Sequence, residues 1–99
     1  MEHNYWNGTS FHNDVINLSY NELVKRIGEP TCGESVDGKT QKEWLMMTDD
    51  NIPFTIYDWK EYNRDVTDGD NVKWNIGHKG GYNCRNSIKM YLEKFGILI

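Results

Sequence analysis

Two stretches of the chain repeat apolar residues with the period of an α-helix. In the first, apolar residues recur at i, i+3, i+4 and i+7: Tyr20, Leu23, Val24 and Ile27. Ser19 and Glu22 have the spacing of a capping box at its start. Gly28 supplies a left-handed end, and Pro30 prevents the helix from continuing. We therefore expect a short amphipathic helix after Ser19.

The second helical pattern lies near the end of the chain. Its apolar positions recur at i, i+4, i+7, i+8 and i+11: Cys84, Ile88, Tyr91, Leu92 and Phe95. This spacing predicts a longer helix that Gly96 ends, and it places Cys84 in the core. Residues 97–99 form an apolar tail, which could fold back against its own sheet as an edge strand. Because so small a domain has little core to receive it, the tail and the Trp6 region predict a homodimer or higher oligomer.

Between the helices, side chains alternate as in β-strands. We expect strands over 42–48 and 52–59, joined by a turn at 49–51, and a third over 72–76 that the glycines after it break. Pro53 lacks an amide donor and suits a strand start or a sheet edge. A further short strand over 9–11 is a weaker expectation.

This order predicts an α+β fold: a small three- to four-stranded antiparallel sheet with two helices packed on one face. The length of 99 residues fits one domain over 1–99. The face away from the helices would carry Tyr57, Trp59 and Asn75, which makes it more aromatic than a solvated face needs to be.

Composition removes several classes of function. The net charge of −4 and the pI near 5.2 argue against a binder of polymeric nucleic acid. No apolar run reaches the ~20 residues of a membrane span, and the first residues are polar rather than secretory. Cys32 and Cys84 form no zinc pattern, so we expect reduced thiols, a cytoplasmic protein, and neither a metal nor a cofactor.

Three segments carry candidate ligand-binding chemistry. The first is a strand, a glycine-rich turn and a helix start, with His78, Lys79 and Arg85 in an otherwise acidic chain. Glycines and helix-terminal amides can hold a phosphate, although neither a P-loop nor a dinucleotide fingerprint is present. Alternatively, this segment is an ordinary loop whose charged side chains are solvated.

The other two segments offer stacking and hydrogen bonding. Tyr57 and Trp59 share a strand face and suit a flat ring, and Lys60, which points the other way, is a further candidate. Alternatively, these rings pack under a helix. The polar run near the N-terminus contributes further candidates, or is a plain loop: Thr9, Ser10, Phe11 and His12. No spacing requires His12, His78 and Asp58 to form a hydrolytic set, so we expect no enzyme.

These segments resemble those of a family of small, mostly uncharacterised bacteriophage proteins. The matching stretches cover residues 8–12, 27–30, 57–62 and 76–78, and the chain departs from the pattern over 79–83. The resemblance implies that the three segments form one site. It also implies an anti-defence role in the host cytoplasm, since one class of such proteins sequesters nucleotide-derived immune signals.

The expectation from sequence is thus a non-catalytic sponge for a small nucleotide-like signal. The aromatic rings would stack on its base, and the basic residues of the glycine-rich segment would hold its phosphates. The main alternative is a protein–protein inhibitor of a host defence enzyme, since exposed Tyr and Trp suit both roles. Cleavage of the signal is a third possibility.

Overall fold

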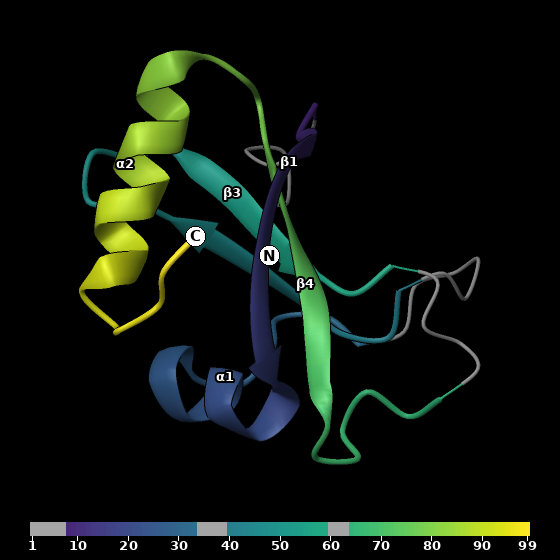
Figure 1. The fold of residues 1–99 in the computed structure, drawn as a ribbon. Helices are drawn as coiled ribbons and strands as arrows, with labels where there is room; N and C mark the ends of the chain where they lie inside the picture. The colour runs from purple at the N-terminus through teal and green to yellow at the C-terminus, as the bar shows by residue number, and fades with distance from the viewer. Residues whose placement is uncertain (1–7, 34–39, 60–63) are drawn as a thin grey trace.

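A computed structural model of the chain describes residues 8–33, 40–59 and 64–99 (Figure 1). Its helices and strands follow in the order β1 (Ser10–Ser19), α1 (Tyr20–Ile27), β2 (Glu43–Met47), β3 (Pro53–Tyr57), β4 (Asn71–His78) and α2 (Tyr82–Glu93).

The four strands form one antiparallel sheet in the order β1-β4-β3-β2. The hairpin β2–β3 places Trp44 opposite Ile56, and Ile56 in turn lies opposite Ile76 of β4. Pro53 is the first residue of β3, as its missing amide donor requires. The arrangement confirms the α+β fold with a four-stranded antiparallel sheet and two helices.

The first strand is longer than the sequence indicated. β1 runs from Ser10 to Ser19 rather than over 9–11, and it pairs with β4 along the edge of the sheet. Its register shifts between Phe11 and Val15, where Asn13 adopts a positive φ of 71°. This bulge interrupts the alternation of apolar and polar residues, which explains why the sequence indicated only the start of the strand.

Both helices cover the same face of the sheet. The buried residues of this layer include Trp44, Phe54 and Trp74 from the sheet, Leu23 from α1 and Leu92 from α2. The rings of Trp44 and Trp74 meet edge to face with centroids 5.2 Å apart. Each buried indole N–H donates to a backbone carbonyl, so neither tryptophan leaves a polar atom unpaired.

The helix ends follow the sequence in most respects. Ser19 caps α1 by accepting a hydrogen bond from the Glu22 amide at 3.2 Å, and Gly28 ends it with a positive φ of 92°. Cys84 of α2 is half-buried rather than in the core, which corrects the expectation for that residue. Neither of these two helices is long and apolar enough to cross a membrane.

The apolar tail folds back onto its own chain. Ile97 is buried in the core, Ile99 packs against it, and only Leu98 remains largely exposed, at 76%. Arg26 donates hydrogen bonds to the carbonyls of Phe95 and Gly96 and holds this end in place. Two of the three tail residues thus pack within their own chain, which weakens the sequence argument for assembly. The Trp6 region, on which that argument also depended, lies outside the described residues.

Candidate functional site

The face of the sheet away from the helices carries a groove of about 440 Å³. Five residues line it: Phe11, Tyr57, Trp59, Lys73 and Asn75. They come from β1, from β3 with the residues after it, and from β4. This groove brings together three of the residues that the sequence marked for binding.

Gly77 of β4 leaves room for the side chains of the neighbouring strand β3. Gly77 lies opposite Phe11 of β1 and Thr55 of β3, and Asn75 lies opposite Tyr57. A Cβ on Gly77 would stand 2.7 Å from Thr55 Oγ1 and 3.4 Å from Tyr57 Cε1. Glycine is therefore needed here, because the Thr55 and Tyr57 side chains approach the backbone of β4 closely.

The aromatic rings of the groove pack against one another in part and are exposed in part. Tyr57 and Trp59 meet edge to face, with centroids 6.3 Å apart. Burial, with a smaller contribution from the charge of Glu43, raises the pKa of Tyr57, so its phenol keeps its proton near neutral pH. Phe11 and Trp59 are 43% and 46% exposed. Both rings thus offer area to a partner.

Asp58 fixes the chain between these two rings. The residue is fully buried, and its carboxylate accepts hydrogen bonds from the Gln41 amide at 2.9 Å and the Lys42 amide at 2.8 Å. Asp58 ties the end of β3 to the residues before β2. It is a structural carboxylate that holds Trp59 in position, and it lies outside the groove lining.

Lys73 brings a positive charge to the groove. In the part of the chain that the structure describes, Lys73 makes no ion pair with an acidic residue. Lys73 belongs to the third strand that the sequence predicted over 72–76, but the sequence analysis assigned it no role. Its alternation with Val72 and Trp74, both buried, was the available signal.

The histidines lie on the other side of the sheet. The rings of His12 and His78 stack with centroids 4.1 Å apart, and His78 is only 3% exposed. Arg85 of α2 pairs with Asp14 of β1 at 3.1 Å. The structure therefore divides the single predicted site into two: an aromatic groove, and a cluster of histidines and charges behind it.

The glycine-rich turn contacts the two histidines and does not form an open phosphate-binding loop. The Gly80 amide donates to His78 Nδ1 at 3.0 Å, and a Cβ on Gly80 would lie 3.5 Å from His12 Cε1. Burial is the main cause that lowers the pKa of His78, and the charges of His12 and Arg85 add to it. A neutral His78 is a poor phosphate ligand.

The remaining residues that the sequence predicted for the site, as far as the structure describes them, do not line the groove. Thr9 is half-buried before β1, and Ser10 lies 3.3 Å from His12 Nε2 through its hydroxyl oxygen. Lys79 is exposed in the turn after β4 and is not one of the residues that line the groove. Lys60 lies outside the described residues.

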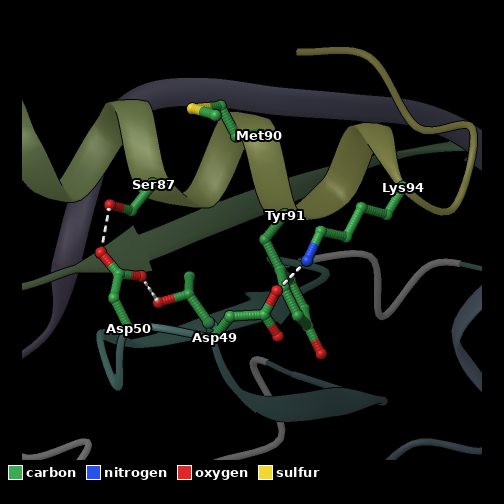
Figure 2. A pocket seen from close by; sticks show the side chains of 7 residues that line it. Asp49, Asp50, Ser87, Met90, Tyr91 and Lys94 are labelled. Carbon is green, nitrogen blue, oxygen red and sulfur yellow. Dashed lines mark hydrogen bonds and ion pairs between the residues drawn. The ribbon is translucent and has the colours of Figure 1, made fainter.

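A second hollow, of about 310 Å³, lies between α2 and the hairpin turn (Figure 2). Asp50 accepts hydrogen bonds from Thr48 and, at 2.8 Å, from Ser87 of α2, while Lys94 forms an ion pair with Asp49. These contacts latch the helix to the hairpin. The charged groups of this hollow already have partners within the fold, which favours a structural role.

A comparison with known protein families, curated protein sequences and solved structures finds no match for this chain. What the protein does must therefore be inferred from its own side chains.

Proposed function

We propose that the protein is a non-catalytic binding protein whose groove takes a small nucleotide-like ligand. The observation that carries this proposal is the gathering of Phe11, Tyr57 and Trp59 around Lys73 on one open sheet face. The volume of about 440 Å³ is within the range of small-molecule sites. The resemblance to phage proteins extends the proposal to sequestration of a nucleotide-derived immune signal.

The aromatic residues suit the base of such a ligand. A nucleobase stacks on an exposed aromatic ring with a gain of about 1–3 kcal/mol. Trp59 presents the largest such ring, and Phe11 faces the groove from the neighbouring side of β4. The amide of Asn75 offers both a donor and an acceptor to a base edge.

The anionic part of the ligand has one evident partner in the groove. Lys73 supplies a point charge without a competing carboxylate among the described groove-lining residues. This assignment replaces the phosphate set expected from sequence, because His78 and Arg85 lie on the other side of the sheet and interact there with other groups.

The test is calorimetric titration of the protein with cyclic dinucleotides and cyclic ADP-ribose isomers. Trp59→Ala should weaken binding roughly tenfold to a hundredfold, the equivalent of one stacked base. Lys73→Gln should weaken it and reduce its dependence on salt. Met90→Ala, which removes an exposed apolar side chain from α2, is the matched control and should leave binding unchanged. Absence of binding across the whole panel overturns the proposal.

The same exposed rings favour a second candidate, an inhibitor that docks on a host protein. Trp and Tyr are enriched at the energetic centres of protein interfaces. Two results together would support this alternative. The wild-type protein would retain one host protein from lysate in stoichiometric amount, and the Trp59→Ala variant would not. Denaturing the purified protein would release no small molecule. A ligand whose mass changes on incubation would instead indicate cleavage.

A further inference from the structure

One short segment of β1 contributes to both sides of the sheet. Phe11 lines the groove, while the next residue, His12, stacks on His78 behind it. His12 Nε2 also lies 3.0 Å from the backbone oxygen of His78, to which it donates. At this end of β1 the bulge interrupts the regular pairing with β4. The histidine contact therefore supplements the ladder that holds Phe11.

The hydrogen bonds of His78 require its neutral form. Because Nδ1 accepts from the Gly80 amide, the single ring proton of His78 must be on Nε2. A second proton would have to go to Nδ1, where it would oppose the Gly80 N–H. The buried Nε2 atom has no hydrogen-bond partner among the described residues, so the fold offers nothing to stabilise an imidazolium there.

The charges around the pair act in opposite directions. His12 of β1 and Arg85 of α2 disfavour a positive charge on His78, and Asp14 of β1 favours it. Asp14 is shared with Arg85 through an ion pair at 3.1 Å. From β3, the residue opposite His78 is the apolar Phe54. No acidic group on these elements is thus devoted to the histidines alone.

We propose that His12 and His78 position the Phe11 wall of the groove, and that protonating the pair releases this end of β1 and opens the groove. Stacked imidazolium rings repel each other, and the Gly80 bond is lost at the same time. The ligand would then be held near neutral pH and released in mild acid. The functional consequence rests on the proposed ligand site, whereas the movement of β1 does not.

The movement is tested without ligand by nuclear magnetic resonance on the full chain. Ring signals of His12 and His78 and the amide signals of Phe11 and Leu23 are followed from about pH 7.5 to pH 5. We expect the Phe11 amide to shift with the midpoint of the His78 ring, while Leu23 in α1 stays unchanged. Either of two results overturns the proposal: the Phe11 amide signal does not shift at the midpoint of the His78 ring, or it shifts only together with that of Leu23 as the protein unfolds.

Conservative variants separate positioning from simple stability. His12→Gln keeps a hydrogen-bond donor but cannot become charged, so the Phe11 shift should move to a different midpoint or vanish. With a ligand from the calorimetric panel, wild-type affinity should fall roughly tenfold per pH unit below the His78 midpoint, and that of His12→Gln should fall less. Equal affinity of the wild type at both ends of the range refutes the regulation, whereas absence of any ligand refutes only the proposed function.

Discussion

The buried carboxylate of Asp58 lies next to Trp59 of the groove in the chain. Asp58 accepts hydrogen bonds from two backbone amides before β2 and thereby fixes the segment that carries Trp59. We expect Asp58→Ala to lower the free energy of unfolding by about 3 kcal/mol, because it leaves buried amides unpaired. Chemical denaturation measures this change. Asp58→Asn, which keeps one acceptor oxygen, should cost less, and equal losses for the two variants would contradict the explanation.

Substitution of Gly77 is expected to affect both the stability of the fold and the proposed ligand binding. A methyl group there would collide with Thr55 Oγ1 and press on the Tyr57 ring. Gly77→Ala should therefore destabilise the protein by about 1–3 kcal/mol and weaken ligand binding as the ring is displaced. Thermal unfolding and calorimetry measure the two effects. Gly33→Ala, at a glycine with open space and no positive φ, is the control; a matching loss there would refute the steric argument.

At the scale of elements, the sequence predicted both helices and three of the four strands. Capping and apolar periodicity are local signals, and Ser19 and Gly28 act as their spacing indicated. The Glu22 carboxylate pairs with Arg26 and does not complete the capping box. β1 was largely missed because its bulge at Asn13 breaks the alternation. β4 was ended early at Gly77, since a glycine that makes room for a neighbouring ring has the same sequence signal as one that breaks a strand.

The latch between α2 and the hairpin predicts a pH dependence. Hydrogen bonds from Thr48 and then Ser87 lower the pKa of Asp50. A lowered carboxyl pKa gives stability that is present above the unfolded value, about 3.9, and is lost as pH falls through the folded value. Ser87→Ala should therefore lose less stability than the wild type between about pH 5 and pH 2.5.

The measurement is chemical denaturation of both proteins at the two pH values. Hydrogen bonds from Thr67 likewise lower the pKa of Asp65. Because the Ser87→Ala substitution leaves these bonds unchanged, Asp65 contributes equally to the stability curves of both proteins. Parallel losses in the two proteins would show that Ser87 does not stabilise the ionised Asp50.

For the whole molecule, the aromatic half of the candidate site was predictable and the polar half was not. The alternation of the strand expected over 52–59 placed Tyr57 and Trp59 on one face. β3 ends at Tyr57, and the hydrogen bonds of Asp58 hold the segment that carries Trp59. The separation of His78 from them depends on how β4 continues past Gly77, which no local pattern reveals. Arg85 was equally out of reach, since its ion pair joins α2 to Asp14 on β1.

The tail yields a prediction at this scale. Ile97 belongs to the chain's own core, so truncation after Gly96 should lower the free energy of unfolding by about 3 kcal/mol. Leu98→Ser should change it by less than about 0.5 kcal/mol, since that side chain is exposed. Thermal unfolding with light scattering on all three proteins measures stability and mass. Unchanged stability after truncation would contradict the packing, and a larger mass that only the tail supports would restore the interface expected from sequence.

The pairing of β1 with β4 has a consequence for how the protein is made. A ribosome releases β1 first, yet its sheet neighbour is the last strand to emerge. Until then Ile16 has no core to enter, and the early chain presents an unpaired edge. Folding must therefore be completed late in synthesis or after release. Nascent chains halted before Asn71 should remain open to protease, while the finished protein resists it.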